Sequence, residues 1–300
     1  MEIIPYDKRS GKIWFNGEQV DWSKAQVHLL SHGLHYASCV FEGIRVYDGE
    51  IFKLNEHTDR LYHSAKRMGM EVSYSKDEIN KSTKQIVETQ KTLNGYVRPI
   101  IWRGSEMMAI SAQKNQINVA VATWEWPSYF SPEDRLRGIS LQTAEWRKPP
   151  ANTMPTDAKA AGLYMICTLS KHKAEKEGFT DALMLDYEGK VCESTGSNIF
   201  FVFNGELHTP IPHCFLNGIT RQTAMSIALN QNIKVVERDI YPEEIKDADE
   251  IFLTGSAVEI NPVRKIDNME FKVGHITKMI SDLYLSEVDE NFQNNKENSQ

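Results

Sequence analysis

The chain has 300 residues, of which 41% are hydrophobic and 25% are charged. These proportions are typical of an ordinary globular protein with an ample core, and the length allows one large domain or two moderate ones. The formal net charge of -7 argues against a nucleic-acid or anionic-membrane partner, because either favours a basic surface.

No targeting or membrane segment is readable. The first eight residues, Met1 to Lys8, lack a basic start followed by an apolar run. No apolar stretch approaches the roughly 18 residues that cross a bilayer. We therefore expect a cytoplasmic protein without a membrane partner.

The sequence favours no metal site. His28, His32 and His35 would align on one helix face, but no acidic or cysteine fourth ligand is nearby. The four cysteines are scattered without a Cys-x-x-Cys pair, which fits reduced thiols better than a disulfide frame or a zinc site. They are Cys39, Cys167, Cys192 and Cys214.

The first half of the chain, residues 1–127, predicts a small α+β domain. Asn16-Gly17 and Asp48-Gly49 are hairpin turns between apolar runs. Asn55 is the expected N-cap of one helix, and the run Ser75–Glu78 is a capping box that opens another. The expected strands lie at 13–15, near 20, within 41–52, at 96–102 and at 117–124.

The second half predicts a larger domain, residues 138–288. Residues 128–137 are polar and proline-containing, and we interpret them as the interdomain linker. A helix is expected from about Asp157 to Glu177, ended by Gly178. The polar tail 289–300 is expected to be disordered. The other expected elements are strands at 182–186, 199–203, 234–238 and 250–253, a helix at 220–231 and a closing helix around 276–283.

Lys159 is the most informative residue. It stands in the run Pro155–Gly162, whose small side chains leave room for an aldehyde to approach the amine and form a Schiff base. Glu193 opens the run Glu193–Phe200 further along, and a carboxylate of this kind could sit on the ring nitrogen of a cofactor. Taken singly, a solvated lysine and an exposed edge-strand glutamate are the simpler explanations of these residues.

Charged side chains also interrupt apolar strand sequence. Glu42 and Arg45 lie in the ribbon 41–52, and Tyr96 and Arg98 share one strand face at a spacing of two. A guanidinium beside a phenol suits a carboxylate. From periodicity alone, an edge-strand arginine paired with a surface acid is the simpler explanation.

Two loops offer backbone amides to an anion. The run Leu216–Arg221 opens a helix, where free N–H groups and the Thr220 hydroxyl could hold a phosphate. A plain N-cap threonine is the alternative. The run Leu253–Ala257 ends a strand in small residues, and its amides could bind an anion or simply form a turn.

Together these motifs resemble the class IV (fold type IV) pyridoxal-phosphate aminotransferases, most closely the bacterial branched-chain amino acid aminotransferases. The matching segments keep one order over nearly the whole chain. They include Ile13–Gly17, Ser31–Tyr36, Phe41–Arg45, Tyr96–Pro99, Lys159, Glu193–Phe200, Gly218–Arg221 and Gly255–Pro262. The resemblance implies a two-domain α+β and α/β fold like that of D-amino acid aminotransferase, with a small α+β domain and a larger β-barrel-like domain with helices.

The resemblance implies pyridoxal 5′-phosphate as the cofactor. Lys159 would form the Schiff base and shuttle the proton between the substrate Cα and the cofactor C4′. Glu193 would keep the pyridine nitrogen protonated, and Tyr164 would bind the phenolate oxygen. The residues expected to anchor the phosphate are Arg60, Ile219, Thr220 and Ser256.

The resemblance also implies a substrate site. The amides of Ser256 and Ala257 would bind the α-carboxylate. Arg98, with Tyr36 of a neighbouring subunit, would receive the distal carboxylate of glutamate or 2-oxoglutarate. The expected assembly is therefore at least a homodimer, with a trimer of dimers left open. The remaining residues expected to bind substrate are Phe41, Gly43, Arg45, Tyr96, Trp126 and Tyr129.

The implied reaction is reversible transfer of the amino group between L-leucine, L-isoleucine or L-valine and 2-oxoglutarate. A D-amino-acid or (R)-amine transaminase and an aminodeoxychorismate lyase are alternatives in the same fold, and a non-catalytic binding protein is an alternative of another class. The chain departs from the family at Ser194 and Asn217, and residues 103–110 lack its glycine-rich loop. That loop helps shape the side-chain pocket, so the preference among the three amino acids stays open.

Overall fold

The structure, a computed structural model, describes residues 4–126 and 137–297, with side chains up to Val288. The chain divides into two compact units. Unit 1 comprises Met1–Pro127 and Ala158–Gly162, and unit 2 comprises Ser128–Asp157 and Leu163–Gln300. The linker expected at 128–137 lies, apart from Arg137, outside the described residues. Within the described part of the chain, no helix has the length and apolarity needed to cross a membrane.

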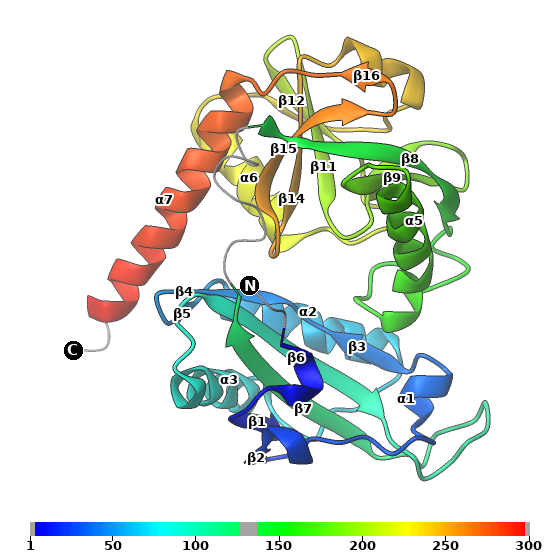
Figure 1. The fold of residues 1–300 in the computed structure, drawn as a ribbon, viewed down its shortest axis with the longest axis vertical. Helices are drawn as coiled ribbons and strands as arrows, with labels where there is room; N and C mark the ends of the chain where they lie inside the picture. The colour runs from blue at the N-terminus through cyan, green and yellow to red at the C-terminus, as the bar shows by residue number, and fades with distance from the viewer. Residues whose placement is uncertain (1–3, 127–136, 298–300) are drawn as a thin grey trace. The chain divides into compact units, whose positions relative to one another are not determined.

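Unit 1 contains a seven-stranded sheet in its described residues, in the order β2-β1-β7-β6-β4-β5, with β3 also paired to β6 (Figure 1). Antiparallel pairing of β6 with β7 runs from Gly95↔Glu125 to Arg103↔Ile117, which confirms the two long strands predicted here. The strands are β1 Lys12–Phe15, β2 Glu18–Asp21, β3 Cys39–Phe41, β4 Ile44–Tyr47, β5 Glu50–Ile51, β6 Gly95–Arg103 and β7 Ile117–Glu125.

Both hairpin turns predicted in unit 1 are confirmed. Asn16 and Gly17 have φ of 47° and 98°, the left-handed pair that a two-residue turn needs to match the strand twist, and they join β1 to β2. Asp48 and Gly49 have φ of 46° and 86° and join β4 to β5.

Helices α2 (Leu54–Arg67) and α3 (Lys76–Gln90) pack against each other. The capping box at Ser75 is confirmed: Glu78 N–H donates to Ser75 Oγ at 3.2 Å, and Ser75 N–H donates to the Glu78 carboxylate at 2.7 Å. The prediction of Asn55 as N-cap of α2 is wrong by two positions. The N-cap is Lys53, whose backbone adopts the left-handed conformation. The Asn55 amide oxygen accepts instead from Asn80 on α3 at 2.8 Å. The short helices of unit 1 are η1 Tyr6–Lys8, η2 Trp22–Lys24 and α1 His32–His35.

Unit 2 contains a nine-stranded sheet in its described residues, in the order β10-β9-β8-β15-β14-β11-β12-β13, with β16 on β15 (Figure 1). The further pairing of β10 with β11 joins the first strand of this series to its sixth and so closes a barrel. The strands are β8 Ile139–Lys148, β9 Asp181–Asp186, β10 Val191–Ser194, β11 Asn198–Phe203, β12 Glu206–Thr209, β13 Val235–Glu237, β14 Glu250–Gly255, β15 Glu259–Ile266 and β16 Met269–Glu270.

Alternating apolar residues of the barrel strands form the core of unit 2. Leu183, Ile199, Leu253 and Val263, from β9, β11, β14 and β15, are fully buried in one cluster. Inward-pointing residues alternate with outward-pointing ones along each strand, as the period of two requires. The predicted strands at 182–186, 199–203, 234–238 and 250–253 are confirmed as β9, β11, β13 and β14.

The helices of unit 2 include α5 (Met165–Lys176), which packs on β8 and β9, and α6 (Ile219–Asn230), which packs on α7 (His275–Glu297). Gly178, with φ of 86°, ends the α5 segment as predicted. The expectation of disorder from residue 289 is wrong up to Glu297, because α7 continues to that residue. Buried Ile280, Tyr284 and Val288 anchor the helix, and a helix already nucleated extends cheaply through polar sequence. The short helices are η3 Ala161–Tyr164 and η4 Pro242–Asp247.

Candidate active site

Lys159 lies on an extended segment and not in the helix predicted from Asp157, because its backbone bonds to distant elements. Its N–H donates to Ser64 Oγ on α2 at 2.9 Å, and its carbonyl accepts from Phe41 N–H at 3.1 Å. The next residue, Ala160, pairs with Val40 as a β-bridge. These contacts assign Ala158–Gly162 to unit 1, whereas the sequence placed them in the second domain. Helical structure begins only at Ala161.

The side chain of Lys159 lies beside two predicted substrate residues. Its Nζ is 5.1 Å from the centre of the Phe41 ring, and the Arg98 guanidinium carbon is 4.7 Å from the same ring. Arg98 also lies 5.5 Å from the Tyr96 ring, as their shared strand face predicted. The buried Nε of Arg98 has no hydrogen-bond partner among the residues that the structure describes. An unpaired buried donor of this kind is costly, so the site suits an added anion.

The structure also brings Gly43, Arg45 and Trp126 to this region of unit 1. The Tyr96 ring packs edge-on to Trp126 with centroids 4.6 Å apart, and Arg45 donates to the Trp126 carbonyl at 2.7 Å. Gly43 has no space for a side chain, because a β-carbon would overlap the Tyr96 hydroxyl. Tyr129 lies outside the described residues, so its predicted role stays a prediction.

Arg60 is held by a buried carboxylate that the sequence did not connect to it. Its Nε and Nη2 donate to the two oxygens of Glu42 at 2.7 and 2.9 Å. His57 contacts the same carboxylate at 2.7 Å. Burial alone raises the pKa of Glu42, but Arg60 and His57 outweigh it and hold this pKa well below its ordinary value. Burial lowers the pKa of His57, although Glu42 opposes that effect. The Glu42 carboxylate therefore fixes the position of Arg60.

Glu193 is buried in unit 2 on β10, and two donors hold its carboxylate. Lys148 Nζ lies 2.7 Å from Oε1, and Asn198 Nδ2 donates to Oε2 at 3.2 Å. Asn198 pairs with Glu193 across the β10–β11 ladder, so its short side chain reaches the carboxylate directly. These two contacts hold the Glu193 carboxylate in one position.

Asn198 also ties Glu193 to the loop that opens α6. Its Nδ2 donates to the Leu216 carbonyl at 3.0 Å, and a β-carbon at Gly218 would overlap its Oδ1. Gly218 is the N-cap of α6, without a side-chain cap. The first N–H groups of a helix have no acceptor within it, and Ile219 and Thr220 occupy these positions, both buried. This end of α6 therefore suits a phosphate.

Ser256 and Ala257 lie in the turn after β14, half-buried. The turn directly follows β14, whose residue Thr254 pairs with Asn198 of β11. Ser256 and Ala257 therefore lie close to Asn198. The Thr254 hydroxyl is buried and has no hydrogen-bond partner in the described part of the chain. The structure thus gathers the predicted residues of unit 2 around Asn198: Glu193, Ile219, Thr220, Ser256 and Ala257. Tyr164, at the end of η3, is the N-cap of α5.

Tyr36 follows the single turn α1 and is 42% exposed. Its ring stacks on His32 with centroids 4.5 Å apart. Both nitrogens of the His32 ring have protein partners, since Nδ1 contacts Ser38 Oγ and Nε2 contacts the Ala109 carbonyl, each at 3.0 Å. His32 therefore supports Tyr36.

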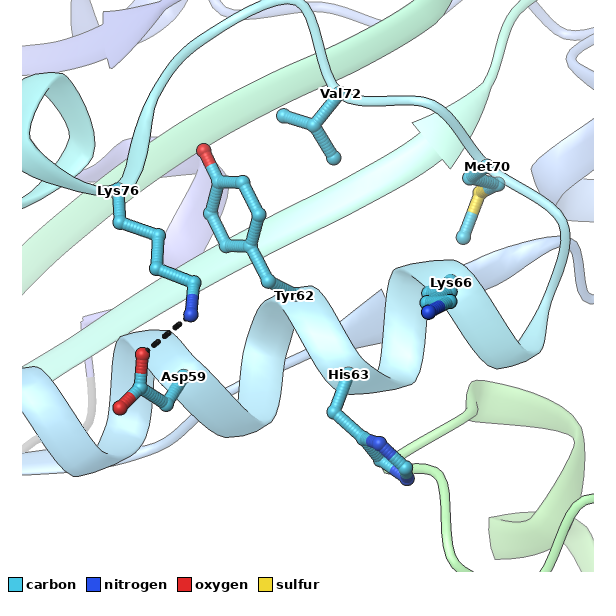
Figure 2. A pocket seen from close by; sticks show the side chains of 7 residues that line it. All are labelled: Asp59, Tyr62, His63, Lys66, Met70, Val72 and Lys76. Carbon is cyan, nitrogen blue, oxygen red and sulfur yellow. Dashed lines mark hydrogen bonds and ion pairs between the residues drawn. The ribbon is translucent and has the colours of Figure 1, made fainter.

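A depression of about 370 Å³ lies beside α2 (Figure 2). Figure 2 shows Lys76 paired with Asp59 at 2.6 Å across one end of it. It contains no residue that the sequence analysis assigned to a site. The lining residues are Asp59, Tyr62, His63, Lys66, Met70, Val72 and Lys76.

Residues 39–266 match the model of the amino-transferase class IV family. The chain belongs to this family. It is 40% identical over 270 residues to a branched-chain-amino-acid aminotransferase of Pseudomonas aeruginosa, covering 89% of this chain and 88% of the relative. It is 36% identical over 286 residues to the branched-chain-amino-acid aminotransferase of Escherichia coli K12, covering 92% and 93%.

Solved structures of class IV relatives share the fold. The Escherichia coli branched-chain amino acid aminotransferase has a TM-score of 0.90 at 35% identity, covering 93% of this chain and 94% of the other. The branched-chain amino acid aminotransferase of T.th., with pyridoxamine 5′-phosphate, has a TM-score of 0.89 at 36% identity, covering 92% and 93%. The predicted fold class, a small α+β domain with a larger barrel-like domain, is confirmed.

Each unit of this class IV aminotransferase, taken by itself, offers groups of a kind that a phosphorylated pyridine cofactor binds. Unit 2 offers a fixed carboxylate at Glu193 and an uncapped helix start at Gly218, and unit 1 offers the amine of Lys159. Lys148 and His57 could not be found from the sequence, because the carboxylates that they contact, Glu193 and Glu42, lie elsewhere in the chain. Asn198 was also missed. Only Asn198, inside the Glu193–Phe200 motif, carried a local signal.

Proposed function

We propose that this chain catalyses the reversible transfer of the amino group between a branched-chain L-amino acid and 2-oxoglutarate, with pyridoxal 5′-phosphate as cofactor. The observation that carries the proposal is the Glu193 carboxylate, buried and held by two donors in the barrel of a class IV aminotransferase. Relatives named as branched-chain aminotransferases, similar over most of their length, support the substrate class.

When bound, the cofactor supplies an aldehyde that reacts with amines and a protonated pyridine ring that withdraws electrons from the substrate Cα. Glu193 holds the ring nitrogen in its charged form, and Tyr164 hydrogen-bonds the ring oxygen. The N–H groups of Ile219 and Thr220, together with Ser256, bind the phosphate at the start of α6. Arg60 adds a guanidinium whose direction Glu42 sets.

Lys159 provides the amine that holds the cofactor and then moves the proton. Its backbone is hydrogen-bonded at both the N–H and the carbonyl. The long side chain can therefore move while the backbone stays in place. The freed amine accepts the proton from the substrate Cα as general base and returns it as general acid. The Phe41 ring beside Nζ excludes water from one side of this path.

One pocket must accept both a branched alkyl group and a carboxylate. Phe41, Tyr96 and Trp126, all in unit 1, give the side-chain site aromatic walls. The family resemblance assigns the α-carboxylate common to all substrates to the amides of Ser256 and Ala257 in unit 2. Arg98 binds the distal carboxylate of glutamate. With an aliphatic substrate, its guanidinium stays over the Phe41 and Tyr96 rings, a cation–π arrangement that lessens the cost of leaving it without an anion.

The active unit is at least a homodimer in this proposal, with Tyr36 completing the site of a neighbouring subunit. Exposed apolar residues close to Tyr36 support an interface here: Leu29 and Leu34 are 72% and 66% exposed. Exposed apolar side chains of this density mark interaction surfaces. We place the enzyme in the cytoplasm, in keeping with its four cysteines, which are all free thiols.

An assay of amino donors tests the proposal. Purified protein with pyridoxal 5′-phosphate and 2-oxoglutarate is offered L-leucine, D-alanine or an aryl amine, and glutamate formation is followed. We expect turnover with L-leucine and little with the other two. Fast D-alanine turnover with inert L-leucine would assign the chain to the D-amino-acid branch instead. A protein without any visible absorption from bound cofactor would point to a non-catalytic role.

A further inference from the structure

Lys148 contacts the Glu193 carboxylate in the interior of unit 2. Its Nζ lies 2.7 Å from Glu193 Oε1, and the two side chains are only 9% and 11% exposed. The same Nζ lies 3.4 Å from the Cys167 Sγ on α5. Lys148 therefore bridges the strand that carries Glu193 and the helix that Tyr164 caps.

Lys148 directly follows an irregularity in β8. Between Thr143 and Arg147, β8 advances four residues while its partner β9 advances only two, from Leu183 to Leu185. Extra residues in a strand re-aim the side chains that follow them. Glu145 to Arg147 are exposed, and Lys148 directly after them is buried. Lys148 is thus a buried cation on the same strand face as buried Ala144.

A buried lysine is stable only with a partner that compensates its lost hydration. Burial by itself lowers the pKa of Lys148, but the Glu193 carboxylate outweighs this and holds the pKa above its ordinary value. The benefit is mutual, because a buried carboxylate also needs a partner of opposite charge to compensate its lost hydration.

The two donors also fix the orientation of the carboxylate. Lys148 holds Oε1 and the Asn198 amide holds Oε2, so the group cannot rotate freely. A carboxylate has about four acceptor positions on its two oxygens, and these two contacts leave capacity for a further donor.

We propose that Lys148 is a positioning residue whose charge holds the Glu193 carboxylate aimed at the ring nitrogen of the cofactor. The inference rests on the proposed function, since it presumes that Glu193 receives that nitrogen. Lys148 acts through its contact with Glu193 and does not contact the substrate.

A double-mutant cycle on cofactor affinity tests this assignment. The dissociation constant of pyridoxal 5′-phosphate is measured on the apoprotein of wild type, Lys148→Met, Glu193→Gln and the double variant. Lys148→Met should weaken binding about tenfold, or about 1.4 kcal/mol, when Glu193 is present. In the Glu193→Gln background it should weaken binding less than about twofold, because the group it acts through is gone. Equal losses in both backgrounds, or no loss, would overturn the proposal.

A cofactor analogue separates positioning from a purely structural role. In 1-deazapyridoxal 5′-phosphate a C–H group replaces the ring nitrogen, so Glu193 has no proton to accept or share. Lys148→Met should change the affinity for this analogue less than about twofold, whereas a general loosening of the barrel would weaken both ligands alike. Lys190→Met is the matched control, because Lys190 pairs with Glu188 and Asp239 at 2.8 Å. It should leave both affinities unchanged.

Two further variants keep the test decisive if Lys148→Met does not fold. Lys148→Arg keeps the cation and should bind the cofactor within about threefold of wild type, while Lys148→Gln keeps a donor without charge and should bind at least about fivefold more weakly. Equal affinities would contradict the role of the charge. A wild-type protein that binds no pyridoxal 5′-phosphate would instead refute the proposed function, so the two failures are distinguishable.

Discussion

Replacing Glu42 with glutamine should destabilise unit 1 and weaken cofactor binding together. Glu42 is fully buried and receives two bonds from Arg60 and one contact from His57. Glutamine keeps the shape but has one acceptor oxygen and no charge, so the mostly buried guanidinium loses its counter-ion. Breaking a buried ion pair costs about 3–5 kcal/mol, and we expect the lower end, about 3 kcal/mol, because the amide oxygen still accepts one bond. The affinity for pyridoxal 5′-phosphate should fall about tenfold as Arg60 loses its direction.

Urea denaturation of the apoprotein, followed by tryptophan fluorescence, measures the first effect. All tryptophans except Trp146 belong to unit 1, so the signal reports mainly on that unit. Glu56→Gln is the matched control, since Glu56 is an exposed glutamate in the first turn of α2, and it should change stability by less than about 1 kcal/mol. If Glu42→Gln shifts stability no more than this control, the buried cluster does not hold Arg60 as described.

The stability of the apoprotein should decline as the pH falls below about 6.5, because burial lowers the pKa of His57 from that value and the unfolded chain takes up the proton first. Thermal melts between pH 7 and 5 should show this decline, at most about 1.4 kcal/mol per pH unit from this group, and His57→Gln should flatten it; an unchanged slope would mean that His57 is not the group responsible. Arg98→Ala should lower kcat/KM for glutamate about 10- to 100-fold more than for L-leucine, because a charged hydrogen bond worth about 1.5–3 kcal/mol is lost only with the dicarboxylic substrate. Equal losses for the two substrates would remove Arg98 from the recognition of the distal carboxylate.

Local chemistry allowed much of the fold to be predicted. Asn16-Gly17, Asp48-Gly49 and the Ser75 capping box act within a few residues, and each has the predicted structure. The strand alternation predicted Tyr96 and Arg98 on one face, and the Arg98 guanidinium lies beside the Tyr96 ring as expected. In each case the partners lie within one turn or one strand.

Long-range contacts explain what could not be predicted. The helix expected through Lys159 is absent because Phe41 and Ser64, about a hundred residues earlier, hydrogen-bond its backbone. Strand β8 was missed because its irregularity interrupts the alternation that marks a strand. In sequence, Lys148 is a basic residue before two prolines, indistinguishable from a solvated charge until β10 brings Glu193 beside it.

The central claim is that Lys159 is the amine that holds the cofactor. Reduction of the holoprotein with borohydride, followed by proteolysis and peptide mapping by mass spectrometry, tests it directly. We predict a single phosphopyridoxyl label on the Pro155–Gly162 segment at Lys159, and no label in Lys159→Ala protein incubated with the same coenzyme. A label on another lysine, or a wild-type protein without any label, would contradict the account.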